Sequence, residues 1–78
     1  MAEVIVYEAP NCPWCDKVKQ FLKENKIKFK AINVAENQKA AREMVQKSGQ
    51  MGVPVTDIDG KIIVGFNEPK IKKLLKIK

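Results

Sequence analysis

The chain has 78 residues, with 15 lysines and arginines against nine carboxylates and no histidine. A domain of this size buries only about 60% of the surface that its unfolded chain exposes, so we expect residues 1–78 to form one small domain. The first residues lack the basic start and apolar run of a signal peptide, and no apolar stretch approaches the ~20 residues of a membrane span. We therefore expect a soluble, cytoplasmic protein that does not contact a membrane.

The net charge of +6 comes almost entirely from lysine, since Arg42 is the only arginine. Surfaces that bind nucleic acids favour arginine forks and aromatic side chains interleaved with basic residues, and neither pattern is present. We interpret the lysines as solvated faces of helices and expect no nucleic-acid partner. A basic surface would still attract anionic thiols or acidic proteins.

The chain begins with a predicted strand and a predicted helix. The apolar, β-branched run Val4–Tyr7 ends before Pro10 and indicates a strand that is buried on both faces. Pro13 suits the first position of a helix because that position needs no partner for an N–H group, which makes Cys12 the N-cap. The apolar side of this helix is expected to comprise Val18, Phe21, Leu22 and Ile27.

A second strand and a second helix follow. In residues 28–34 apolar side chains alternate with polar ones (Phe29, Ala31 or Ile32, then Val34), which predicts a second strand. Because a helical crossover joins it to the first strand, the two strands should be parallel. A helix is predicted from about Glu36 to Lys47, with Gly49 as its C-terminal stop. The buried side of this helix is expected to comprise Ala40, Ala41, Met44 and Val45.

The last third of the sequence predicts two strands and a helix. Val53–Ile58 and Lys61–Val64 flank Asp59-Gly60, a strong signal for an antiparallel hairpin. Residues 65–67 form a turn before a terminal helix whose apolar side comprises Ile71, Leu74, Leu75 and Ile77. The order βαβ followed by ββα indicates an α/β fold.

The two cysteines lie in the segment Cys12-Pro13-Trp14-Cys15, at the turn from strand to helix. Tetrahedral zinc needs four Cys or His ligands, which this chain lacks, so we expect no metal. A structural disulfide that closes so short a loop would remove only about 2 kcal/mol of unfolded-state entropy. The spacing therefore favours a reversible redox pair.

The position of Cys12 at the N-cap favours its thiolate. The free N–H groups of Trp14 and Cys15 point toward the Cys12 sulfur, and the helix dipole adds positive charge there. We predict that Cys12 attacks substrates and that Cys15 lies within bonding reach. A lowered thiol pKa chiefly helps this sulfur to leave from a mixed disulfide. Lys19 is a further candidate because it projects toward the same helix end, although it is equally well interpreted as an exposed helix lysine.

Two further features point to substrate binding. Trp14 lies between the cysteines on an exposed turn, so we expect it to flank a substrate groove. Pro54 cannot donate to a strand ladder, and we favour a cis Val53–Pro54 peptide over an ordinary turn proline. This conformation would leave the backbone of Val53 free to pair with an extended substrate segment.

These motifs together resemble the glutaredoxin family over nearly the whole chain. The residues that carry the resemblance are Tyr7 to Asn11 leading into Cys12-Pro13-Trp14-Cys15, Lys19, Val53-Pro54, Asp59-Gly60-Lys61 and Gly65-Phe66. The resemblance implies a thioredoxin fold with a four-stranded mixed sheet flanked by three helices. It also implies that Cys12 is the nucleophile, that Cys15 is the resolving thiol, and that a cis-Pro54 lies beside them.

The resemblance leaves two electron donors open. Glutathione-using members place a lysine or arginine three residues before the first cysteine, where this chain has Ala9, and a Gly-Gly pair closely followed by Asp, where it has Gly65-Phe66-Asn67. Gly65-Phe66 followed by Pro69 is similar to redoxins that are recharged by thioredoxin reductase and donate electrons to ribonucleotide reductase. We count Gly65, Phe66 and Asn67 as substrate-binding candidates in either case.

We therefore expect a monomeric dithiol–disulfide oxidoreductase that reduces protein disulfides, glutathione mixed disulfides or both. No bound cofactor is expected; glutathione is the expected electron donor and thioredoxin reductase the alternative. A non-enzymatic alternative is an iron–sulfur cluster carrier. Pro13 argues against it by resemblance, because cluster-bridging glutaredoxins usually lack proline after the first cysteine.

Overall fold

The computed structural model describes residues 3–76, which form a sheet and three helices. In chain order the elements are β1 (Val4–Glu8), α1 (Pro13–Glu24), β2 (Lys30–Asn33), α2 (Gln38–Ser48), β3 (Val55–Ile58), β4 (Lys61–Val64) and α3 (Glu68–Leu75). Ile77, which the sequence places on the apolar side of the last helix, lies outside the described residues. Among residues 3–76, no helix is long and apolar enough to cross a membrane.

The four strands form one mixed sheet in the order β2-β1-β3-β4. β1 pairs in parallel with β2, and the β1–β3 and β3–β4 pairs are antiparallel. Asp59 and Gly60 connect β3 to β4 with positive φ angles of 51° and 88°, as a two-residue hairpin turn of this kind requires. The predicted parallel crossover and the predicted hairpin are both confirmed.

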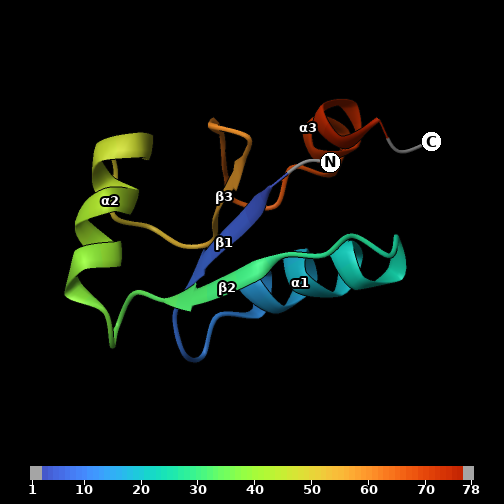
Figure 1. Cartoon of the computed structure of the whole chain (residues 1–78). Helices are drawn as coiled ribbons and strands as arrows, with labels where there is room; N and C mark the ends of the chain where they lie inside the picture. Colours follow the sequence, from blue (N-terminus) through green and yellow to red (C-terminus); the bar gives the residue numbers. More distant parts are fainter. Residues whose placement is uncertain (1–2, 77–78) are drawn as a thin grey trace.

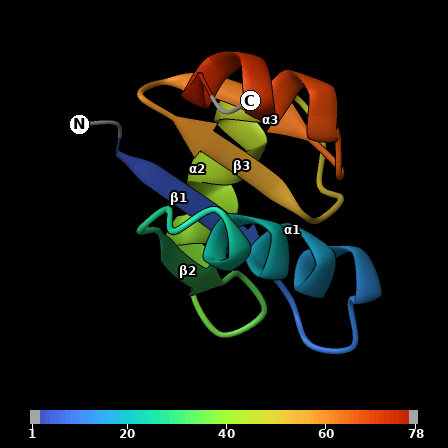
Figure 2. The same ribbon diagram turned by 90° about the vertical axis from the view of Figure 1, so that its right-hand side faces the viewer.

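Helices α1 and α3 cover one face of the sheet and α2 covers the other (Figures 1 and 2). Successive residues of a strand point to opposite faces, so β1 sends Val6 toward α1 and α3 but Tyr7 toward α2. The core on the α1 and α3 side comprises Val4, Val6, Val18, Leu22, Ile58, Ile63 and Ile71. The core on the α2 side comprises Tyr7, Ala40, Met44 and Val55. The prediction that the first strand is buried on both faces is thus confirmed.

The second helix differs from the prediction at its start and on one face. It begins at Gln38 because the side chain of Asn37 caps it, accepting a hydrogen bond from the Ala40 N–H at 3.0 Å. Val45 is 36% exposed, so the prediction that it lies on the buried side is wrong. Ala40 and Met44, four residues apart, define the buried stripe, and Val45 lies about 100° further around the helix. The predicted stop at Gly49 is confirmed by its φ of 75°.

Lys47 connects α2 to the sheet through a polar cluster. Its ammonium group donates to Asp57 Oδ2 at 2.7 Å and to the Tyr7 hydroxyl at 2.8 Å. The other carboxylate oxygen of Asp57 accepts the Gly60 N–H at 2.7 Å, in the hairpin turn. These hydrogen bonds satisfy a carboxylate that is almost fully buried, with 7% of Asp57 exposed.

Candidate active site

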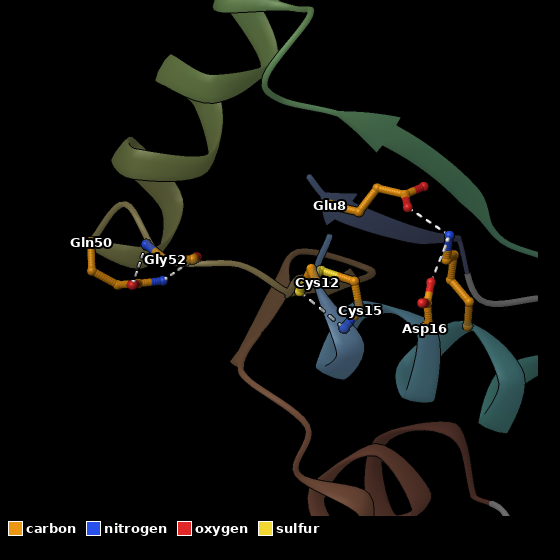
Figure 3. Close-up of a disulfide and its surroundings, with 7 residues drawn as sticks. Glu8, Cys12, Cys15, Asp16, Gln50 and Gly52 are labelled. Carbon is orange, nitrogen blue, oxygen red and sulfur yellow. Dashed lines mark hydrogen bonds and ion pairs between the residues drawn. A yellow bond between two sulfur atoms is a disulfide. The ribbon is translucent and has the colours of Figure 1, made fainter. Parts of the chain in front are cut away.

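The two cysteines form a disulfide at the N-terminus of α1, so the structure describes the oxidised state. Cys12 is the N-cap, with φ −116° and ψ 97°, and Pro13 occupies the first helical turn. The Cys12 Sγ accepts a hydrogen bond from the Cys15 N–H at 3.1 Å (Figure 3). The predicted N-cap position of Cys12 is confirmed, and one free amide of the helix end points at its sulfur.

The two sulfurs differ in their access to solvent. Cys12 is half-buried, whereas Cys15 is only 1% exposed and begins the buried side of α1 that continues with Val18 and Leu22. Of the two cysteines, only Cys12 is exposed enough to meet an incoming sulfur. Because sulfur exchange needs an accessible target, this difference separates the two residues chemically.

A groove of about 620 Å³ lies next to the disulfide turn, and the 55%-exposed Trp14 forms part of its wall. It is lined by Trp14, Val53, Pro54, Val64, Gly65, Phe66, Asn67, Glu68 and Pro69. The structure thus brings together all six residues predicted to bind substrate. Sequence reasoning did not identify the other three, although a proline just after a capping Asn signals that a helix starts at the groove.

The Val53–Pro54 peptide bond is cis, as expected. The Gly65 N–H donates to the Pro54 carbonyl at 2.8 Å, and this hydrogen bond joins two sides of the groove. It extends the β3–β4 pairing by one residue past Val55 and Val64. Gly65 has a φ of +76°, a conformation that favours glycine. Within residues 3–76 the backbone N–H and C=O of Val53 make no hydrogen bond. They are available to a bound segment.

Aromatic rings build the wall of the groove between α1 and α3. The Phe66 ring lies 6.4 Å from Trp14 and 6.0 Å from Phe21, measured between ring centroids. The Lys17 ammonium lies 4.3 Å from the centroid of the Trp14 ring, a cation–π contact that the sequence did not indicate. Asn67, by contrast, uses its side-chain oxygen to cap α3, accepting the Lys70 N–H at 3.2 Å.

Lys19 is engaged by two carboxylates. Its Nζ donates to Glu8 Oε1 at 2.6 Å and lies 3.7 Å from Asp16 Oδ1 (Figure 3). The hydrogen bond to Glu8 is the main cause that raises the pKa of Lys19; Asp16 adds to the rise and burial opposes it. Glu8, at the end of β1, was not identified from the sequence. The effect of Lys19 on Cys12 stays a prediction.

Residues 3–76 contain no group of three or more His, Cys, Asp or Glu side chains that could hold a metal ion. The chemistry that the geometry supports is exchange between sulfur atoms. One sulfur is accessible, its partner is shielded within bonding distance, and a groove with free backbone groups lies alongside.

Comparison with known proteins identifies the family. The Glutaredoxin family model matches residues 4–63. A "glutaredoxin-like 8.6 kDa protein in rubredoxin operon" of Clostridium pasteurianum is 51% identical over 70 residues, covering 90% of this chain and 93% of that protein. The glutaredoxin-like protein NrdH of Lactococcus lactis, strain MG1363, is 36% identical over 74 residues, covering 91% and 97%.

Solved structures place the fold. The glutaredoxin of Archaeoglobus fulgidus superposes with a TM-score of 0.87 at 33% identity, covering 97% of this chain and 88% of that one. A point mutant of the thioredoxin-like protein BC3987 superposes with a TM-score of 0.92 at 32% identity over the full length of both chains. These matches confirm the expected thioredoxin fold. The chain belongs to the glutaredoxin family and is a thiol–disulfide oxidoreductase.

Proposed function

We propose that Cys12 is the nucleophile and Cys15 the resolving thiol in the reduction of disulfides. The Cys12 thiolate attacks one sulfur of the substrate disulfide, whose S–S bond breaks, and the departing thiolate takes up a proton. Cys15 then loses its proton and attacks the Cys12 sulfur, which releases the second substrate thiol. Two electrons pass to the substrate, and the Cys12–Cys15 disulfide remains.

The observation that supports this division of roles is the unequal exposure of the two sulfurs. Cys12 is accessible and its Sγ already accepts the Cys15 amide at 3.1 Å, while Cys15 is 1% exposed. A thiolate at the start of α1 would be stabilised by that amide and by the helix dipole. The same stabilisation makes Cys12 a good leaving group when Cys15 attacks it.

We propose that the groove holds the substrate beside Cys12. The free backbone groups of Val53, next to Pro54, would pair with an extended segment as an added strand does. Trp14 and Phe66 offer apolar contacts, and the Gly65 carbonyl and the Asn67 side-chain NH₂ group offer polar ones. The substrates are protein disulfides, glutathione mixed disulfides or both.

Glutathione is the electron donor in this proposal, with no cofactor bound to the chain. A second candidate donor is a thioredoxin reductase. Ala9 leaves the position three residues before Cys12 without a cation, and Phe66 with Pro69 lines the groove where glutathione-using members carry glycine and a nearby aspartate. The similarity to NrdH also supports thioredoxin reductase as the donor. We further propose that the chain acts as a single-domain cytoplasmic monomer.

The division of roles is tested with two serine variants. Cys12→Ser should abolish the reduction of every disulfide substrate. Cys15→Ser should keep activity on glutathione mixed disulfides, which a second glutathione can resolve, but lose activity on protein disulfides. Identical behaviour of the two variants on both substrates would show that the roles are misassigned.

The donor is tested by coupling turnover to glutathione with glutathione reductase, and separately to thioredoxin reductase, each with NADPH. Higher turnover with glutathione supports the first candidate, and turnover only with thioredoxin reductase supports the second. Visible absorbance of protein purified without oxygen would instead favour the cluster carrier.

A further inference from the structure

Large apolar side chains that are exposed to solvent gather on two surfaces. Among residues 3–76 there are four: Trp14, Val45, Met51 and Val64. Trp14 and Val64 line the groove described above. Met51, at 80% exposure, and Val45 instead line a separate hollow of about 350 Å³, together with Ala41, Arg42 and Gln46. We call Val45, Met51 and Ala41 the apolar shelf.

The loop that carries Met51 is held by its own side chains. The Gln50 Nε2 donates to the Gly52 carbonyl at 3.0 Å, and the Gly52 N–H donates to Gln50 Oε1 at 2.6 Å (Figure 3). A Cβ atom at Gly52 would lie 2.7 Å from that Oε1, so a larger residue at this position would displace the Gln50 side chain. Gln50 thereby satisfies both backbone groups of Gly52 and holds the residue between them, Met51, on the outside.

This loop leads directly to Val53, where we propose that the substrate pairs. Met51 lies two residues before Val53, whose N–H and C=O are unpaired within residues 3–76. Two residues of backbone span at most about 7 Å, so Met51 lies within that distance of Val53 along the chain. Because only Gly52 separates Met51 from Val53, a polypeptide paired at Val53 can extend to the apolar shelf, whereas a disulfide of two single amino acids is too short to do so.

We propose that the apolar shelf is a specificity site that receives an apolar side chain of a polypeptide substrate paired at Val53. The inference rests on the proposed function and narrows it, because it favours polypeptide disulfides over small ones. Met suits such a site, since its flexible, polarisable thioether adapts to side chains of different shape. Gln50 is a positioning residue for the shelf.

The test follows the oxidation of pre-reduced protein in a single turnover, which needs no electron donor. The probes are a synthetic peptide disulfide with leucine close to its cysteine, and cystine. Met51→Ser should lower the second-order rate constant with the peptide about 10-fold, as burial of one such side chain implies, and leave the rate with cystine unchanged. Met51→Leu is the matched control and should keep the wild-type rate with both probes.

Gln50→Ala should also slow the reaction with the peptide, because the loop loses both hydrogen bonds to Gly52. The rate constant with cystine should again be unchanged. The proposed role of the apolar shelf is overturned if Met51→Ser leaves the rate constant with the peptide unchanged, or if it lowers the rate constants with both probes equally. It is also overturned if Met51→Ser acts by dissociating a dimer in sedimentation experiments. A wild-type protein that reacts with neither probe overturns the proposed function itself.

Discussion

Two lysine–carboxylate pairs each connect a helix to the sheet, on opposite faces of the molecule. Lys19 of α1 binds Glu8 of β1 at 2.6 Å beside the redox turn, and Lys47 of α2 binds Asp57 of β3 at 2.7 Å on the other face. The residue types and distances are nearly the same. Their surroundings differ in burial and in the number of hydrogen-bond partners, and we therefore expect the Lys47 pair to contribute more to stability than the Lys19 pair.

The Lys47 pair belongs to a larger network than the Lys19 pair. The Asp57 side chain is 9% exposed, its second oxygen accepts the Gly60 N–H, and Lys47 also donates to the Tyr7 hydroxyl. The Glu8 side chain is 19% exposed, and within the described chain Lys19 gains only the more distant Asp16. Hydrogen bonds to Asp57 and then Tyr7 raise the pKa of Lys47, more strongly than Glu8 raises that of Lys19.

The largest expected effect comes from removing the Lys47 charge. Lys47→Met should lower the free energy of unfolding by roughly 2–3 kcal/mol, because it leaves the Asp57 carboxylate buried without its cation. For a chain of this size the midpoint of thermal unfolding should fall by roughly 10–20 °C. Calorimetry of the oxidised protein measures this, and Lys47→Arg is the control that keeps the charge. An unchanged midpoint would show that Asp57 does not need the pair.

The Lys47 pair should also produce a stability loss at alkaline pH. The pKa of Lys47 is higher in the folded state than its usual 10.5. A raised pKa means that its contribution is complete below pH 10.5 and declines as the pH rises toward the folded value. Between pH 9.5 and 11.5 the stability gap between wild type and Lys47→Met should therefore narrow by about 1 kcal/mol, after allowance for the partial exposure of Lys47. Denaturant unfolding at both pH values measures the gap, and a constant gap would contradict the prediction.

Replacing both partners should cost less than replacing one. Lys47→Met combined with Asp57→Leu removes the buried charge together with its partner, and apolar replacements of buried pairs are often neutral. We expect the double variant to recover most of the loss and to lie within about 1 kcal/mol of the wild type. The double-mutant cycle in denaturant gives the coupling energy. Additive losses would mean that the two side chains act independently.

The smallest effect on stability is expected from the Lys19–Glu8 pair. Lys19→Met should cost less than about 1 kcal/mol, as is usual for partly exposed ion pairs. Its effect should appear in reactivity instead. Glu8→Gln should leave the Lys19 charge balanced only by the more distant Asp16 and speed alkylation of Cys12 by iodoacetamide at pH 6, whereas Lys19→Met should slow it. Lys19→Arg is the matched control. Equal alkylation rates in all variants would show that Lys19 does not influence Cys12.

Local patterns were sufficient to predict the helices, the strands and the N-cap position of Cys12. The short apolar runs, the Asp59-Gly60 turn and the order of strands and helices indicate the sheet and its pairing, because periodicity and turn chemistry act between near neighbours in the chain. Pro13 after Cys12 places a sulfur at a helix start by the same local logic. The six residues predicted to bind substrate line one groove in the structure, and their binding role stays a prediction.

Contacts between distant residues were decided only by the tertiary structure. Glu8 takes up the charge of Lys19, and Lys47 reaches Asp57 and Tyr7, because packing brings a helix face against particular strand positions. The exposure of Val45 likewise depends on how α2 is rotated over the sheet, since two adjacent faces of the helix carry apolar residues. Sequence spacing describes which residues share a helix face or strand face, but only the packed layers decide which groups that face meets.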